Sequence, residues 1–155
     1  MGERYEPTSD FLNAVIAEDA PLSGSAMAEE NLRRLIELMR DDDRSNRDWA
    51  TFLLAQEEID TPDVRDALIR ATEDDDDMVR AEAVLGLAVR DPRLALPFVQ
   101  QALQADTVEI PMFEAAALCA HPSLIEDLRI WAEHSGQPLA KRLAAEALAA
   151  CEKAR

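Results

Sequence analysis

The stretch that decides the fold is DDDDMVRAEAVLGLAVRDPRLALPFVQQAL, residues 74–103. After the aspartates, Val79, Ala83 and Leu87 recur at the spacing of one helical face. Pro92 follows an aspartate and suits the first position of a new helix, because proline lacks the backbone N–H that would go unused there. The stretch therefore predicts two helices, one ending near residue 90 and one starting near residue 92, joined by a very short turn.

Similar signals for the start of a helix recur along the chain. Thr61, Pro62 and Asp63 supply a capping hydroxyl, a proline for the first helical position and an acid for the first turn. Aromatic residues make up only 5% and there are 4 glycines, a composition that favours closely packed helices over a sheet. We expect about nine helices and no strand, with the remaining helices at 9–18, 26–40, 45–58, 62–72, 110–120, 122–134 and 138–151.

The chain also repeats itself with a period near 32 residues. The segments 47–55, 80–88, 112–120 and 144–152 align in register. One column of the alignment is always small, which is what two helices require where they approach most closely. The column before it is glutamate in three copies and tryptophan in the first. The small column consists of Ala50, Ala83, Ala115 and Ala147, and the column before it of Trp49, Glu82, Glu114 and Glu146.

With these motifs the chain resembles a HEAT-type repeat of the phycobilin-lyase-like subclass. The residues that carry the resemblance are Asp77, Val79, Arg80, Ala83, Leu85, Gly86, Asp91 and Pro92. The resemblance implies an all-α, right-handed α-α superhelix (HEAT-like solenoid). At 155 residues the chain is expected to form a single domain, with a capping helix pair at about 9–40 and HEAT-like repeats at about 41–153.

The charge limits the kinds of partner. The chain has 32 acidic and 16 basic residues and a net charge of −16. Such a surface repels phosphate backbones and anionic lipids and attracts basic surfaces. We therefore expect no nucleic acid and no membrane as partner, and another protein with a basic surface instead. The oligomeric state stays open.

Two acidic turns are the first candidate binding site. They precede successive repeats and should lie side by side in a stacked array, forming an acidic ridge. One aspartate per turn is enough to cap a helix, so the surplus needs another explanation. A solvated edge and a docking ridge for a basic partner both remain open, whereas the spacing does not fit a calcium loop. The acidic ridge consists of Asp41, Asp42, Asp43, Asp74, Asp75, Asp76 and Asp77.

The second candidate is a concave face. The resemblance implies that the second helix of each repeat lines this face, which is the usual docking surface of such solenoids. If the repeats begin with the helices at 45–58 and near 79–90, the second helices carry a polar stripe and several charges. The candidate residues are Arg65, Arg70, Gln100, Gln101, Gln104 and Glu126.

No residue points to catalysis. His121 and His134 lack further ligands at helical spacing, so no metal is expected. Cys119 and Cys151 share a column of neighbouring repeats, and we read them as free thiols in the core, too far apart for a disulfide. Trp49 is expected to be covered by the N-terminal helix pair. Glycine-rich phosphate loops and standard enzyme motifs are absent, so we expect no catalytic residue and no cofactor.

The sequence therefore favours a non-catalytic protein–protein interaction scaffold. One alternative is a tetrapyrrole (bilin) lyase, isomerase or pigment chaperone, suggested by the repeat subclass alone. A HEAT-like DNA glycosylase would need a basic concave face, which this composition disfavours. A cytoplasmic location in a bacterial-type cell is expected, because the N-terminus has charges throughout and no apolar core of a secretory signal. Residues 1–7 are expected to be disordered.

Overall fold

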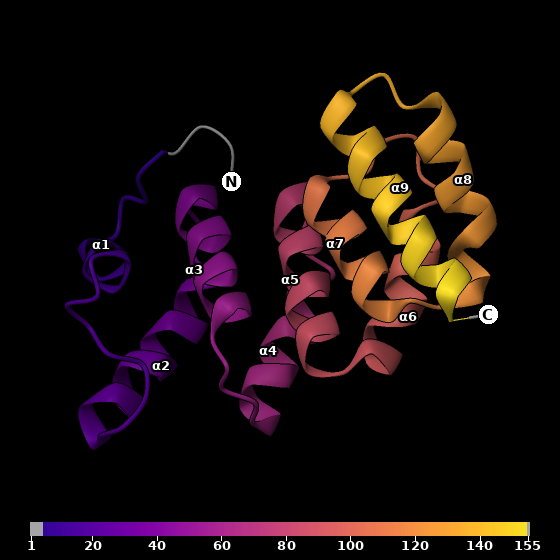
Figure 1. The fold of residues 1–155 in the computed structure, drawn as a ribbon. Helices are drawn as coiled ribbons and strands as arrows, with labels where there is room; N and C mark the ends of the chain where they lie inside the picture. The colour runs from indigo at the N-terminus through magenta and orange to yellow at the C-terminus, as the bar shows by residue number, and fades with distance from the viewer. Residues whose placement is uncertain (1–4, 155) are drawn as a thin grey trace.

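The computed structural model describes residues 5–154, which form nine α-helices, one 3-10 turn and no strand (Figure 1). The prediction of an all-α solenoid of about nine helices is thereby confirmed. The helices are α1 (Asp10–Ile16), α2 (Ala26–Leu38), α3 (Arg44–Gln56), α4 (Pro62–Ala71), α5 (Asp77–Arg90), α6 (Pro92–Ala102), α7 (Ile110–Cys119), α8 (Ile125–His134) and α9 (Pro138–Lys153); the 3-10 turn η1 (Pro122–Leu124) precedes α8.

The helix starts follow from side chains that cap them. The hydroxyl of Thr61 accepts a hydrogen bond from the backbone N–H of Val64, and α4 then begins at Pro62. The segment predicted as one helix from residue 122 starts instead with η1. His121 is the reason, because its ring Nδ1 accepts the backbone N–H of Ser123 and tightens the first turn.

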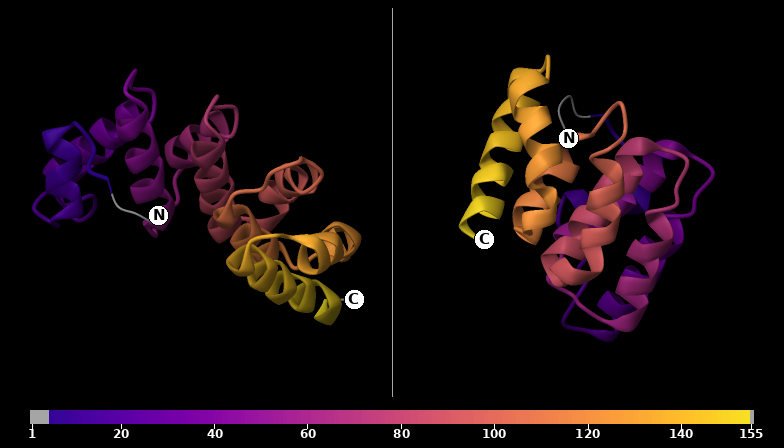
Figure 2. Two further views of the ribbon diagram at one scale, coloured as in Figure 1. Left: turned by 90° about the horizontal axis from the view of Figure 1, so that it is seen from above. Right: turned by 90° about the vertical axis from the view of Figure 1, so that its right-hand side faces the viewer.

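Alternate helices form one continuous row. α3 packs on α5, α5 on α7 and α7 on α9, while α4, α6 and α8 pack against this row and make no extensive contact with one another. Viewed from above, the chain follows a curved path (Figure 2). The small column predicted from the repeats lies at the contacts of the row and is fully buried in all four copies: Ala50, Ala83, Ala115 and Ala147.

Gly86 allows α5 to approach α3 and α4 closely. A Cβ atom added to Gly86 would lie 3.0 Å from the Cβ of Ala55 and 3.0 Å from a methyl of Leu68. Any side chain on this position of α5 would therefore push α3 and α4 away.

Arg90 joins neighbouring helices at the other end of α5. Its guanidinium is half-buried and donates five hydrogen bonds to backbone carbonyls. Four of these carbonyls belong to the end of α3 and the turn after it, where the last carbonyls of a helix lack partners within the helix. The five acceptors are Leu54, Ala55, Glu57, Ile59 and Gly86.

The segment before α1 covers Trp49. The indole N–H donates to the backbone oxygen of Tyr5 at 2.7 Å, and the two rings meet edge to face. Trp49 is only 4% exposed, and Tyr5 in the segment before α1 contributes cover that the sequence had assigned to the helix pair. The expectation of disorder for residues 1–7 is wrong for Tyr5 and Pro7, because the tryptophan and its N–H gain a partner there. Residues 1–4 lie outside the described part of the chain.

Candidate functional site

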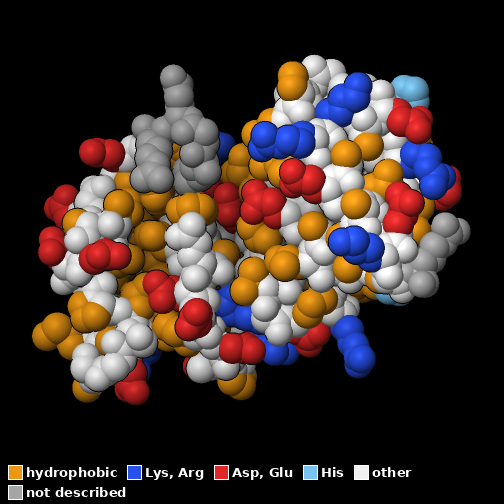
Figure 3. Space-filling view, viewed as in Figure 1, with side chains coloured by type: hydrophobic (Ala, Val, Ile, Leu, Met, Phe, Trp, Pro, Cys, Tyr) orange, Lys and Arg blue, Asp and Glu red, His pale blue; other side chains and the backbone are white. Residues whose placement is uncertain are grey.

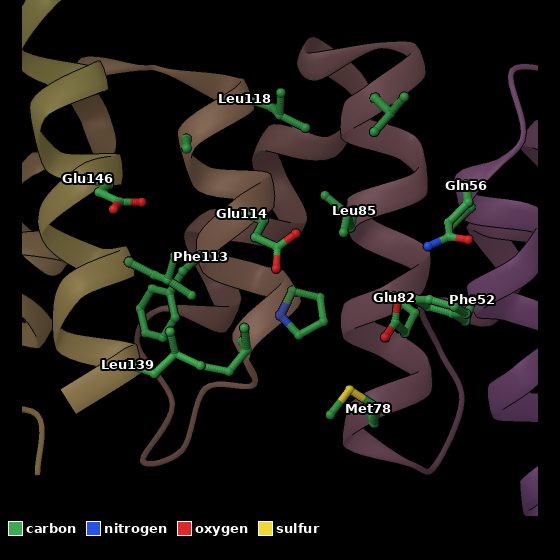
Figure 4. Close-up of a pocket in the computed structure, with 16 residues that line it drawn as sticks. Phe52, Gln56, Met78, Glu82, Leu85, Phe113, Glu114, Leu118, Leu139 and Glu146 are labelled. Carbon is green, nitrogen blue, oxygen red and sulfur yellow. The ribbon is translucent and has the colours of Figure 1, made fainter. Parts of the chain in front are cut away.

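One groove runs along the row of α3, α5, α7 and α9. It has a volume of about 870 Å³, and all sixteen residues that line it come from these four helices (Figure 4). Of the six large hydrophobic side chains that stay exposed in the described residues, three line this groove: Val89, Leu118 and Leu139. The same face is hollowed near its centre in the space-filling view, with hydrophobic and acidic side chains side by side (Figure 3). We call this feature the apolar groove.

A row of three carboxylates crosses the apolar groove. Glu82, Glu114 and Glu146 belong to successive helices of the row and all line the groove (Figure 4). Each stands one residue before a member of the small column, so the contact between helices places the carboxylate beside it, on the groove side. We call these residues the glutamate ladder. Among the described residues, the groove lining contains no lysine, arginine or histidine.

The members of the ladder differ in burial and pairing. Glu82 is 3% exposed and accepts no hydrogen bond from residues 5–154. Glu114 is exposed and free of ion pairs with the described residues, whereas Glu146 stands 3.9 Å from Arg142. The ladder therefore offers carboxylates whose capacity for hydrogen bonds and ion pairs is largely unused.

Burial changes the acidity of Glu82. Desolvation is the main cause, and the negative charges of Asp48 on α3 and Glu114 on α7 add to it, raising the pKa of Glu82 to about 7. A carboxyl group in this state changes its charge near neutral pH.

Asp48 is a second buried acid close to Glu82. It is 1% exposed, and the hydroxyl of Tyr5 donates a hydrogen bond to its Oδ2. Its other oxygen has no partner among the described residues, and neither has the buried hydroxyl of Thr51. Desolvation raises the pKa of Asp48, and burial together with the bond to Asp48 holds the pKa of Tyr5 well above its usual value. The α3 end of the row thus contains polar groups that folding leaves incompletely satisfied.

Arginines in the first turn of α3 bind much of the acidic ridge. Arg47 binds Asp74 at 3.1 Å and Asp75 at 3.2 Å, and Arg44 binds Asp76. These pairs place the two acidic turns side by side and tie one repeat to the next. The surplus of aspartates, which capping alone did not explain, therefore has a structural role.

The remaining acids of the ridge serve their own turns. Asp43 caps α3 through the N–H of Ser45, and Asp41 accepts from the side chain of Asn46. Asp77 pairs with Arg80 within α5. Asp42, Asp75 and Asp77 are the exposed members of the ridge that cap no helix, although Asp75 pairs with Arg47, and docking at the ridge stays a prediction.

The residues predicted for a concave face lie on the other row of helices. None of the six lines the apolar groove. These six residues do not line the groove because the groove follows the helices that share the small column and pack on one another, and the six belong to the other row. Several of the six already have partners: Arg65 binds Asp60, Gln100 binds Ser123 and Glu126 binds Arg129. Arg65 and Arg70 lie on α4, Gln100, Gln101 and Gln104 on α6 or just after it, and Glu126 on α8.

The histidines and cysteines take local positions. His121 caps η1, and His134 ends α8 as an exposed residue. Cys119 and Cys151 are free thiols, and burial raises the pKa of the Cys119 thiol to about 11, which keeps it protonated. Within residues 5–154 no three His, Cys, Asp or Glu side chains come together in a way that could hold a metal ion.

Comparison with known proteins agrees with this architecture. HEAT repeats match residues 32–118, which is more than half of the sequence, so the chain belongs to the HEAT-repeat family. The match is to HEAT repeats in general and does not confirm the phycobilin-lyase-like subclass. HEAT repeats are scaffolds whose extended surfaces bind other proteins. None of the described helices is long and apolar enough to cross a membrane.

Two similar proteins come from Escherichia coli. Protein YibA of strain K12 is 31% identical over 91 residues, which is 59% of this chain and 32% of YibA, and the O157:H7 protein gives the same values. The chain thus spans about a third of the length of the curated relatives it matches. The X-ray structure of E. coli YibA has a TM-score of 0.61 at 21% identity, over 90% of this chain and 54% of that one, which supports the fold.

Proposed function

We propose that this chain is a non-catalytic protein-interaction scaffold that holds a basic segment of a partner protein in the apolar groove. The observation that carries the proposal is the concentration of exposed hydrophobic side chains along one continuous groove over four helices. A soluble protein seldom leaves such a surface uncovered unless something binds there.

The charge of the groove favours a basic partner. The lining formed by residues 5–154 carries three glutamates and no cation, and the whole chain has a net charge of −16. A basic segment would be attracted at long range and would find carboxylates between the apolar contacts. The acidic ridge could extend this attraction, but its arginine pairs leave fewer free carboxylates than the sequence suggests.

The pigment-lyase alternative fits the groove less well. A bilin carries propionate groups, which the glutamate ladder would repel. As far as the chain is described, the lining offers neither a cysteine for covalent attachment nor a cation to hold a carboxylate. A nucleic acid meets the same repulsion, because phosphates would face acids on the groove. We therefore keep the scaffold as the proposed function.

Photo-crosslinking tests the proposal and separates the three candidate surfaces. A photoreactive amino acid is placed at one of three exposed positions, one for each surface. These are Leu118 in the groove, Gln104 just after α6 on the predicted concave face, and Asp75 on the acidic ridge. We expect one discrete protein to crosslink from Leu118 in native lysate. That protein, once purified, should bind the Leu118→Lys variant at least tenfold more weakly than the wild type. Crosslinking from Gln104 or Asp75 without Leu118 would contradict the groove as the binding surface.

A further inference from the structure

The glutamate ladder has a regular spacing that can select its ligand. Its members occupy equivalent positions on α5, α7 and α9, and consecutive helices of the row pack directly. Packed helices stand about 8–10 Å apart, so neighbouring carboxylates of the ladder are separated by roughly that distance. A ligand lying across the three helices would meet one carboxylate per repeat.

We propose that the apolar groove binds an amphipathic helix of the partner, with lysine or arginine side chains seven residues apart, one for each member of the glutamate ladder. The proposal rests on the groove being the binding surface. The bound segment would be a helix of a partner protein, and its positive charges would have a defined spacing.

The spacing favours a helix over an extended segment. A helix rises 1.5 Å per residue, so residues seven apart are about 10.5 Å apart and face the same side. In an extended strand, residues on one side lie at about 6.6 Å or about 13 Å from one another, and neither value matches the ladder. Between the basic positions, the same face of the partner helix would place apolar side chains against Val89, Leu118 and Leu139.

The burial of Glu82 is a second observation, beside the spacing of the glutamate ladder to which it belongs. It is a carboxyl group at 3% exposure that lines the groove and accepts no hydrogen bond from the described residues. Buried carboxylates normally have a partner within the protein. A lysine or arginine of a bound helix would donate to this carboxylate, and the neighbouring Phe52, Met78 and Leu85 of the groove would pack on its aliphatic stem.

The expected preference can be measured with designed peptides and the full chain. The first peptide is an alanine- and leucine-rich helix of about three heptads with lysines seven residues apart. The second has the same composition with lysines five residues apart, which turns them to different sides of the helix. The third replaces the lysines of the first by glutamine. Binding is measured by fluorescence anisotropy at low and high salt, with wild-type protein and with Glu82→Gln and Glu114→Gln/Glu146→Gln variants.

A matched control is Glu152→Gln, which removes an exposed carboxylate from α9 outside the groove. We expect the first peptide to bind about tenfold more tightly than the second or third, an advantage that shrinks in both ladder variants and persists in Glu152→Gln. The exposed positions of Glu114 and Glu146 keep that variant informative if Glu82→Gln alters folding.

Two results would overturn the proposal. Equal affinity for the seven- and five-residue spacings would show that the ladder does not discriminate between spacings of the lysines. Absence of binding by all three peptides would show that the groove does not bind such a helix. Either result leaves the scaffold standing if Leu118 still crosslinks to a cellular protein. If Leu118 captures nothing and the neighbouring surfaces do, the groove itself is wrong.

Discussion

Replacing the buried acid Glu82 with glutamine should stabilise the protein in a strongly pH-dependent way. The pKa of Glu82 is raised from 4.5 to about 7, chiefly by desolvation and further by Asp48 and Glu114. The folded protein therefore holds this proton more tightly than the unfolded chain does. The stability that the protonated acid contributes is complete below pH 4.5 and is lost as the pH rises to about 7 and beyond.

The magnitude follows from the two pKa values. Each pKa unit corresponds to about 1.4 kcal/mol, so ionised Glu82 costs about 3 kcal/mol of folding free energy above pH 7. Glutamine has nearly the shape of the protonated acid and cannot ionise. The Glu82→Gln variant should therefore match the wild type near pH 4.5 and exceed it by up to about 3 kcal/mol at pH 8.

Urea unfolding at several pH values between 4.5 and 8 measures this difference, provided that both proteins show the same dependence on denaturant. Glu114→Gln is the control, since its carboxylate is exposed and its change in stability should stay small at every pH. The reasoning is refuted if Glu82→Gln gives the same difference in unfolding free energy at pH 5 and pH 8, or if the variant is the less stable protein at pH 8.

Three further changes test how the helices are held together. Arg90→Met removes five hydrogen bonds to backbone carbonyls and should destabilise by about 3 kcal/mol in urea unfolding; a loss below about 1 kcal/mol would mean that water replaces them. Gly86→Leu forces a side chain against Ala55 and Leu68 and should cost about 3 kcal/mol, whereas an unchanged melting temperature would show that α3 can move aside. Deleting residues 1–40, which include the capping pair predicted at about 9–40, should expose Trp49, shift its fluorescence to longer wavelength and lower the melting temperature; an unshifted spectrum would show that the repeats need no cap.

The helices could be predicted from the sequence because their ends carry local signals. Thr61 caps α4, Pro92 opens α6, and both act within one turn of chain. The period near 32 residues was equally visible, because a small residue must recur wherever neighbouring helices of the row α3, α5, α7 and α9 touch. The local signals at helix ends and the rule that closely packed helices need small residues were therefore enough to predict the architecture.

The apolar groove lies on α3, α5, α7 and α9, whereas the predicted concave face uses α4, α6 and α8, and binding by those six residues stays a prediction. A period of 32 residues says that two helices alternate, but it does not say which of them opens a repeat. The small column carried the missing signal: Ala83 and Ala115 mark the helices that approach most closely, and that row bears the groove. The partners of the acidic ridge were not predictable in this way, because the contact of Arg47 with Asp74 depends on how α3 meets a turn 27 residues further along the chain.

Glu82 links stability to binding. A carboxylate that costs folding free energy and finds no partner within residues 5–154 would be replaced at no loss if its role were structural, since glutamine fits the same space. If the ladder recognises a partner, a single change should move two quantities in opposite directions: Glu82→Gln should raise the unfolding free energy at pH 8 and weaken binding of the lysine peptide. Glu114→Gln, at an exposed position, should weaken binding with little change in stability. A Glu82→Gln variant that gains stability and keeps full affinity would show that the buried acid belongs to the folded core alone, and that the register of the ladder begins at Glu114.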